Sequence, residues 1–580
     1  MVIADVRARC LIACWLVACG PTPTHHGDGG GDDGSNNQPH TLVAISVMPT
    51  NAIVELDLNM TGTQPYVAIG NYADGTTEDL TAMATWTVAN PAVGAMNGTT
   101  LQIPAFTASN AVTSKITASF GGFDGPAQIT VVAYRKSGTQ LDFFFVLPYQ
   151  DPMGPAMKPL DFSTGIPSLD VFFLMDTTGS MGGEIRNLQS SLNSTVTPGI
   201  RAAIPDSQFG VGAFDDFPVS VYGSFCGAGD GTYDQPFKLR QPITSNLTSV
   251  QTAVNGLTTA TGATIGCGGD TPEAGIEAIY QAATGEGLTG PSPTSVPANH
   301  TGVGGVGYRS GTMPVVVAIT DAPSHGPGET TTCAGSTGPY ANPVAAVAHS
   351  RAQAKTALAN ICARAVGIAA VNTADPSCSG EAYLQDLATA TGARVAPSAW
   401  DVGTRPAGCG PTQCCTDFNG VGRAPDAQGL CPMVFRVDIS GNGVGTSVAT
   451  GIQMLTRFAT FNVPTDRSGV TTDINGNPLP APHTTADFLK SIAPTSFVLP
   501  PPPPVVPAPT FDATTFYGVT PGTKITFTVD AFNDFVMQTN DAQIFRATIR
   551  VTASGCTPLD QRDVLILVPP QPIVLQKPSR

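Results

Sequence analysis

Residues 169–181 read LDVFFLMDTTGSM and join an unbroken apolar run to a cluster of oxygen-bearing side chains. The apolar part predicts a strand that is buried on both faces, as strands of a parallel sheet are. The next segment, EIRNLQSSLNSTV, predicts an amphipathic helix whose apolar face carries Ile185, Leu188, Leu192 and Val196. A buried strand followed by an amphipathic helix indicates an α/β fold.

The alternation of strands and helices continues to about residue 460. Further strands are expected at FGVGAF, PVVVAIT and ARAVGIAAV, and helices near 272–284, 343–361 and 380–391. A last helix, VGTSVATGIQML, runs into the strand TRFATFNVP. We therefore predict a doubly wound (Rossmann-like), mainly parallel α/β domain over 168–460, with its binding groups at the carboxyl ends of the strands.

The first acidic loop at such a strand end is DTTGS, which offers the carboxylate of Asp176 and the hydroxyls of Thr178 and Ser180. Hard divalent cations bind oxygen ligands of this kind, and Mg²⁺ arranges them as an octahedron while keeping some waters. The alternative is that the threonine and serine side chains cap the following helix.

Two more acidic loops follow, and each also has an alternative interpretation. In GGDTPEAGIEAIYQA, Asp270 and Glu273 fit a helix cap with Pro272 in the first turn. In VVVAITDAPSHG, Asp321 fits an ordinary turn at a strand end. The occurrence of all three loops at equivalent strand ends favours a shared cation site.

The DTTGS loop resembles the DxSxS motif of von Willebrand factor type A domains. With FGVGAFDDFPVSVYG and the two later loops, it resembles the integrin β-subunit I-like domain over about 165–460. This resemblance implies that Thr178, Ser180 and Glu273 coordinate Mg²⁺ or Mn²⁺ at a metal-ion-dependent adhesion site. It also implies that Asp176 and Asp321 contribute directly or through water.

The resemblance further implies two neighbouring metal sites. A Ca²⁺ site is expected at Asp216, Asp270, the Pro272 carbonyl and Glu273, although Gly268 stands where the family has an asparagine ligand. A third site needs two acidic residues, where this chain has Gly183 and Glu184, so we expect Glu184 to form a weak site or none.

The N-terminus predicts export. Arg7 and Arg9 precede a short apolar run that ends in LVAC at Cys19, which resembles the lipobox of bacterial lipoproteins. We expect residues 1–19 to be a signal peptide, Cys19 to be lipidated, and residues 20–40 to be a flexible Gly/Asp-rich tether. Gly20 favours the outer membrane of a bacterial cell envelope. A plain secretory signal is the alternative.

Short β-rich runs flank the α/β domain. Residues 41–134 predict an antiparallel sandwich and resemble the bacterial Ig-like group 2 domain. Strands in 135–167 and a C-terminal sandwich at 510–570 are expected to form one discontinuous sandwich, as in the integrin hybrid domain, or else separate domains. Residues 461–509, with a polyproline run, predict a linker, and 571–580 a tail.

Ten cysteines follow the signal, an even number in an exported chain, so disulfides are expected, including those of a cysteine-rich loop at 397–432. A zinc knot is the alternative for that loop. The formal charge of −16 with no basic cluster argues against nucleic acid as a partner.

No G-x-S-x-G motif is present, and none of the seven histidines stands where a catalytic triad needs one, so an enzyme is not expected. His300, His325 and His349 are expected to be solvated or structural. We expect a metal-dependent adhesion protein that binds the acidic side chain of a protein partner. The alternative is a structural envelope lipoprotein in which the metal only stabilises the fold.

Overall fold

The computed structural model describes residues 39–138, 141–223, 234–258, 268–331 and 333–571. The expected signal peptide, Cys19, nearly all of the tether and the tail after residue 571 lie outside these residues. The described residues fall into two compact units: those up to residue 52 with 63–102 and 115–128, and those in 53–62, 103–114 and from 129 onward. In the described part of the chain, no helix is long and apolar enough to cross a membrane.

The region predicted as an Ig-like sandwich, 41–134, is built from strands in three small sheets. The strand orders are β1-β4-β5, β2-β10-β9-β6 and β3-β8-β7. Their bounds are Leu42–Met48 (β1), Asn51–Asp57 (β2), Gly62–Pro65 (β3), Val67–Tyr72 (β4), Thr77–Asp79 (β5), Thr85–Val88 (β6), Ala95–Asn97 (β7), Thr100–Ile103 (β8), Asn110–Phe120 (β9) and Phe123–Tyr134 (β10). The pairings β1 with β4 and β6 with β9 are antiparallel, as the short alternating runs predict.

The α/β organisation predicted for 168–460 is present. One six-stranded sheet has the order β15-β14-β13-β16-β17-β20. Its strands are Leu169–Asp176 (β13), Ser207–Phe214 (β14), Lys238–Thr244 (β15), Met313–Thr320 (β16), Arg364–Val371 (β17) and Val434–Asp438 (β20). All pair in parallel except β15, which is antiparallel to β14. Every residue of β13, β16 and β17 is buried, as the continuous apolar runs require.

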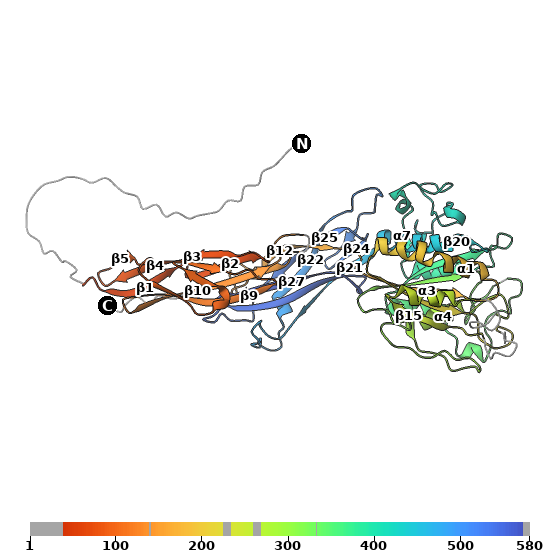
Figure 1. The fold of residues 1–580 in the computed structure, drawn as a ribbon, viewed down its shortest axis with the longest axis horizontal. Helices are drawn as coiled ribbons and strands as arrows, with labels where there is room; N and C mark the ends of the chain where they lie inside the picture. Colours follow the sequence, from red (N-terminus) through yellow and green to blue (C-terminus); the bar gives the residue numbers. More distant parts are fainter. Residues whose placement is uncertain (1–38, 139–140, 224–233, 259–267, 332, 572–580) are drawn as a thin grey trace, which may run out of the picture. The chain divides into compact units, whose positions relative to one another are not determined.

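Helices cover both faces of this sheet (Figure 1). One group, in which each helix contacts at least one other, is α1 (Gly182–Ser191), α2 (Thr197–Ala203), α3 (Leu247–Asn255) and α7 (Val444–Phe458). The others are α4 (Gly275–Thr284), α5 (Arg351–Asn360) and α6 (Glu381–Ala390). The four apolar residues predicted for one helical face, at 185, 188, 192 and 196, are all buried. The amphipathic pattern therefore marked the face that packs on the sheet.

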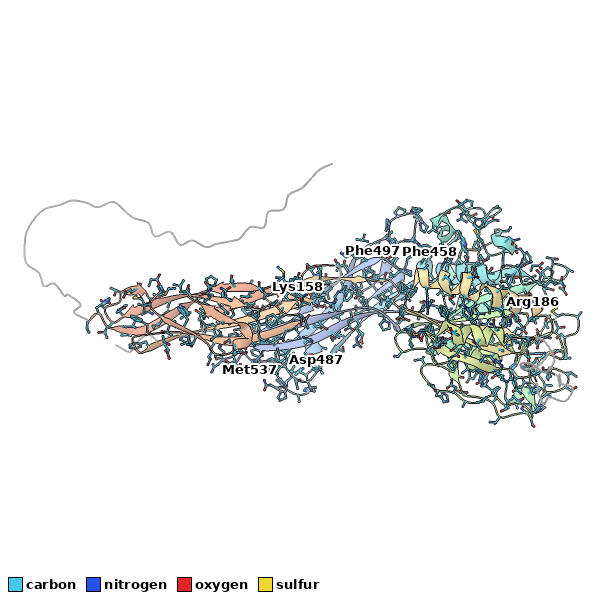
Figure 2. All side chains as sticks on the ribbon, viewed as in Figure 1. Lys158, Arg186, Phe458, Asp487, Phe497 and Met537 are labelled. Carbon is cyan, nitrogen blue, oxygen red and sulfur yellow. A yellow bond between two sulfur atoms is a disulfide. The ribbon has the colours of Figure 1, made fainter. Side chains whose placement is uncertain are left out.

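Strands from before and after the α/β domain share two further sheets, ordered β11-β27-β26-β21-β24-β23 and β12-β25-β22. The strands are Phe143–Val146 (β11), Ala156–Ser163 (β12), Phe461–Gly469 (β21), Leu489–Val498 (β22), Thr510–Phe511 (β23), Thr515–Val519 (β24), Lys524–Ala531 (β25), Gln543–Ala553 (β26) and Thr557–Val568 (β27). The ring centroids of Phe516 and Phe527, one from each sheet, lie 5.1 Å apart. Figure 2 labels Lys158 on β12, Phe497 on β22 and Phe458 at the end of α7.

The segment 461–509 differs from the linker predicted for it, because it contributes β21 and β22 to these sheets. Strand β11 pairs in parallel with β27, and β12 pairs antiparallel with β25. The α/β domain is thus inserted between strands that pair with one another.

Disulfides form, as the even number of cysteines after residue 19 predicts. Within the cysteine-rich loop the pairs are Cys409–Cys415 and Cys414–Cys431, an arrangement that contradicts the zinc alternative. Cys333–Cys378 joins the loops that follow β16 and β17. Cys362–Cys556 joins the α/β domain to the turn between β26 and β27. Cys226 and Cys267 lie outside the described residues.

Candidate functional site

The register of the parallel strands brings the acidic loops to one edge of the sheet. Asp176, the last residue of β13, is the register partner of Phe214, the last residue of β14. On the other side, Met175 is the partner of Ile319 in β16. The loops that leave β13, β14 and β16 therefore start side by side, as expected at the carboxyl edge of a doubly wound sheet.

The DTTGS loop folds around the carboxylate of Asp176. The backbone N–H and the hydroxyl of Thr178 donate to Asp176 Oδ1 at 2.9 and 2.7 Å, and the Thr320 hydroxyl donates to Oδ2 at 2.6 Å. Helix α1 begins after Met181 and has no side-chain cap hydrogen bond. The helix-cap interpretation of Thr178 and Ser180 is therefore wrong.

Glu273 reaches the same place from the loop before α4. Its backbone N–H donates to Pro323 O at 3.0 Å, and its carbonyl accepts from His325 N at 2.7 Å, which ties this loop to the one after β16. Helix α4 starts at Gly275 after Ala274, again without a side-chain cap. The capping interpretation of Asp270 and Glu273 is thus also contradicted.

Asp321 and Ser180 lie on the side of the site that faces solvent. Ser180 lies beside the Asp321 carboxylate and favours its charged form, which lowers its pKa against the larger rise that burial causes. The negative charge of Asp321 in turn acts on Asp176. Ser180 is exposed and Asp321 is half-buried, whereas Asp176, Thr178 and Glu273 are buried. The five residues predicted for the adhesion site therefore converge, and the group is open to solvent on the side of Ser180.

Burial and mutual repulsion disfavour the charged forms of these carboxyls. Burial, with the charge of Asp321 as the second cause, raises the pKa of Asp176 to about 7. Burial raises the pKa of Asp321 as well. The pKa of Glu273 lies well above its ordinary value because of burial and the nearby charges of Asp176, Asp216 and other acids. Without a compensating cation, the ionised site is electrostatically unfavourable.

Unpaired buried oxygen atoms test whether the site fits a cation. Glu273 Oε2, Asp215 Oδ2 and Asp216 Oδ2 are buried and have no hydrogen-bond partner among the residues that the structure describes. Buried carboxylate oxygens are normally hydrogen-bonded or bound to metal ions, because burial of an unpaired charge is costly. An all-oxygen set of carboxylates and hydroxyls is also what Mg²⁺ and Ca²⁺ prefer, so these residues fit a divalent cation.

The expected second site is richer in acids than the sequence motifs predict. Besides Asp216 and Asp270, it includes Asp215, whose Oδ1 accepts from the Thr177 hydroxyl at 2.7 Å, and the buried Asp234. The charge of Asp234 helps to raise the pKa of Asp215 and Asp216 well above the ordinary value, after burial itself. The doubled aspartate in FDDFP signals Asp215, whereas the segment around Asp234 matches no motif.

Two glycines stand at positions where the expected neighbouring metal sites would carry ligands. Gly268 has a φ of +78°, and a Cβ there would lie 2.8 Å from Glu273 Oε1, so an asparagine at this position would require the Glu273 side chain to move. A Cβ on Gly183 would lie 2.4 Å from the Ser440 carbonyl oxygen. Pro272 lies directly before Glu273 in the same loop.

Glu184, the remaining acid of the expected third site, is buried at the start of α1. Within the described ranges, neither of its carboxylate oxygens has a hydrogen-bond partner. Burial raises its pKa to about 7, and the charges of Asp321, Asp176 and Asp438 add to this. The structure therefore places Glu184 beside the other acids but provides no second acidic side chain at position 183.

Comparisons with known proteins give structural neighbours. The chain matches no protein-family model and no curated protein sequence. One similar structure is a von Willebrand factor type A protein from Catenulispora acidiphila, with 10% identity, a TM-score of 0.26, and 76% of each chain covered.

Another neighbour is the pilus adhesin SpaC from Lactobacillus rhamnosus GG in an open conformation, with 11% identity and a TM-score of 0.27. That match covers 84% of this chain and 55% of the adhesin, so the chain spans about half of the adhesin's length. These TM-scores are too low to transfer a function from either protein. The chain is therefore similar to one type A protein and one adhesin, without a family assignment.

Proposed function

We propose that this chain is a surface-anchored protein that binds a partner protein through a divalent cation at the carboxyl edge of its α/β sheet. The observation that supports this proposal most is a set of buried carboxyls with unpaired oxygens beside the exposed hydroxyl of Ser180. The carboxylates would hold a cation from the buried side, and the exposed side would leave one of its coordination positions free for a partner.

In this proposal the residues that hold Mg²⁺ or Mn²⁺ are those that converge in the structure, namely Asp176, Thr178, Ser180, Glu273 and Asp321. The bound ion supplies a Lewis-acidic position for a carboxylate oxygen of the partner. Thr320 and the Thr178 backbone fix the orientation of Asp176, and the exposed hydroxyl of Ser180 lies beside the Asp321 carboxylate. The proposed partner carries an exposed acidic side chain.

A structural envelope protein is the competing proposal. A cation that only stabilises the fold would be expected in a closed shell of carboxylates, whereas here the hydroxyl ligand Ser180 and its neighbour Gly179 are exposed. This exposure favours the binding function. The β-rich region 41–134 then serves as an Ig-like spacer, and the two-sheet region as a discontinuous sandwich that carries the α/β domain.

A displayed library of random peptides tests the binding function, because it samples many acidic sequences at once. Full-length protein is immobilised in millimolar Mg²⁺, and bound peptides are eluted with EDTA. We expect the eluted peptides to be enriched in Asp or Glu, and we expect Asp321→Ala protein to retain weaker binding. Eluted peptides without acidic residues, or equal binding in EDTA, would contradict the proposal.

The lipid anchor predicts the behaviour of Cys19→Ser in the native host. Because the tether offers no other attachment, we expect this variant to move from the membrane fraction to the soluble fraction. Fractionation with a high-salt wash, followed by immunoblotting, measures this. A variant that remains in washed membranes would contradict lipidation at Cys19. The adhesion site is tested separately by the peptide library, so the two proposals can fail independently.

Helix α7 is expected to respond to occupation of the site. The loop before α7 lies against the start of α1, since a Cβ on Gly441 would lie 2.2 Å from the carbonyl carbon of Gly183. The Gly445 N–H also donates to Asn187 Oδ1 at 3.0 Å. A shift of the DTTGS loop is therefore passed by contact to α7, which leads into β21.

Hydrogen exchange measures this response. We expect residues 444–456 to exchange at different rates with an acidic peptide bound in Mg²⁺ and with Mg²⁺ alone. Residues 351–360 of α5, which pack mainly against α4 in the described part of the chain, are the internal control. Identical exchange of 444–456 in both states would show that α7 does not take part.

A further inference from the structure

A histidine lies inside the second acidic cluster. His325 Nε2 is 3.1 Å from both carboxylate oxygens of Asp270 and 3.7 Å from Asp216 Oδ2. One ligand atom from each of the three residues lies within 4.8 Å of the others. The side chains of all three are almost completely buried, so their polar atoms face one another rather than bulk water.

Surrounding donors fix the two carboxylates. The Tyr340 hydroxyl and the Phe217 backbone N–H both donate to Asp216 Oδ1, the latter at 2.6 Å. Asp216 Oδ2, which faces His325, is buried and has no hydrogen-bond partner in the described part of the chain. The Thr337 backbone N–H and hydroxyl donate to Asp270 Oδ2 at 3.0 and 2.6 Å. Outer groups of this kind commonly orient metal ligands.

The imidazole is held by its surroundings as well. The ring of His325 stacks on Tyr340 at 4.6 Å between centroids and meets Tyr222 edge to face at 5.1 Å. The backbone N–H of His325 donates to Glu273 O at 2.7 Å. Cys333–Cys378 ties down the loop that carries His325, Thr337 and Tyr340. The ring therefore has little freedom to turn away from the two carboxylates.

We propose that Asp216, Asp270 and His325 form a binding site for a divalent transition-metal ion, with Zn²⁺ as the preferred ion. Imidazole is a common ligand of Zn²⁺, whereas Ca²⁺ and Mg²⁺ take oxygen ligands. Tetrahedral bonds of about 2.0–2.1 Å place ligand atoms roughly 3.3 Å apart, between the observed 3.1 and 3.7 Å. Two carboxylates and a neutral imidazole balance the charge of a divalent ion, and water fills the fourth position.

This site differs from the Ca²⁺ site expected from the sequence in both its ligands and its metal. The expected site uses the Pro272 carbonyl and Glu273, and it does not use a histidine. In the new assignment Glu273 serves only the adhesion site, and His325 is a ligand rather than a structural residue. The proposal does not depend on the adhesion function, because it concerns different ligands and a different metal.

Co²⁺ is a suitable probe because its visible absorption reports on ligands and geometry. Full-length protein carrying His25→Gln and His26→Gln, which removes the paired histidines of the tether, is titrated with Co²⁺ in millimolar Mg²⁺ and Ca²⁺. We expect one equivalent of Co²⁺ to bind, Zn²⁺ to displace it, and His325→Gln to weaken binding at least tenfold. His349→Gln, a histidine outside this cluster that pairs with Glu277, is the matched control.

Two results would overturn the proposal. The first is Co²⁺ or Zn²⁺ binding that is equal in His325→Gln and the parent protein, and the second is no binding in millimolar Mg²⁺. If His325→Gln does not fold, X-ray absorption of the Zn²⁺-loaded parent decides, because the proposal requires one imidazole in the coordination shell. A Mg²⁺-induced rise in melting temperature, measured in the same proteins, tests the adhesion site separately. This rise can be absent while Co²⁺ still binds, and it can be present when Co²⁺ does not bind.

Discussion

Glu273→Gln is expected to remove the stabilisation that Mg²⁺ gives to the α/β domain, together with binding of acidic peptides. An ion at one hundred times its dissociation constant stabilises a fold by about 2.7 kcal/mol, which raises the melting temperature by about 5 °C for a domain of this size. Glu273 is buried among several acids and has an unpaired oxygen, so its loss deprives the ion of a ligand. In EDTA the same change removes repulsion, and the melting temperature should stay equal or rise.

Asp170→Asn is the matched control, because Asp170 is a buried carboxylate at the opposite end of the same strand, β13. It accepts from Arg309 Nε at 2.8 Å and from the Thr312 hydroxyl at 3.0 Å. Breaking this pair should lower the melting temperature equally in Mg²⁺ and in EDTA. Differential scanning fluorimetry of both variants measures the contrast. A Glu273→Gln protein with an undiminished Mg²⁺ shift would refute the assigned ligand set.

The metal-free protein is expected to lose stability as the pH rises from 5.5 to 8.5. Burial raises the pKa of Asp176 and of Glu184 to about 7 in the folded chain, above the ordinary values of 3.8 and 4.5 that hold when the chain is unfolded. A raised pKa means that the folded chain holds its proton longer. The free energy of unfolding is therefore greatest below the pKa of the unfolded chain. It falls as the pH rises from that value to the pKa of the folded chain, and then levels off. For Asp176 this amounts to roughly 2 kcal/mol over the interval.

Mg²⁺ should reduce this dependence, because it replaces the proton on Asp176 and on the other carboxyls that bind it, whereas Glu184, which is not a proposed ligand, keeps its contribution. Urea denaturation at pH 5.5 and 8.5, in EDTA and in millimolar Mg²⁺, provides the four free energies of unfolding required. We expect a clear drop in the free energy of unfolding in EDTA and a distinctly smaller one in Mg²⁺. If stability in EDTA is equal at both pH values, these acids are not held in the buried, mutually repelling arrangement.

The sequence predicted the α/β domain well because its signals are local. The run before Asp176 reveals a buried strand by composition alone, and parallel strands place successive loops at one edge. The loops of Asp176, Glu273 and Asp321 were therefore correctly expected to meet. Their competing cap interpretations failed because α1 and α4 start only after Met181 and Ala274.

The sequence did not indicate a role for two residues of the second acidic cluster, because only tertiary contacts bring them there. Asp234 lies in a segment without periodicity or motif, and His325 is indistinguishable in sequence from a solvated histidine until its ring is seen between Tyr222 and Tyr340. Strand β22 was missed because it contains Pro494, which argues against a strand. It is tolerated here because β22 is at the edge of its sheet.

The insertion of the α/β domain between paired strands sets the order in which the chain can fold. Strands β11 and β12 leave the synthesising or exporting machinery early, but their partners β27 and β25 come last. Until then their edges are unpaired and open to aggregation. Early folding of the α/β domain brings its two ends together and so shortens the effective loop between the early and the late strands. Pairing of β11 with β27 and of β12 with β25 then costs less chain entropy. Truncation after residue 460 would leave the early strands permanently without partners.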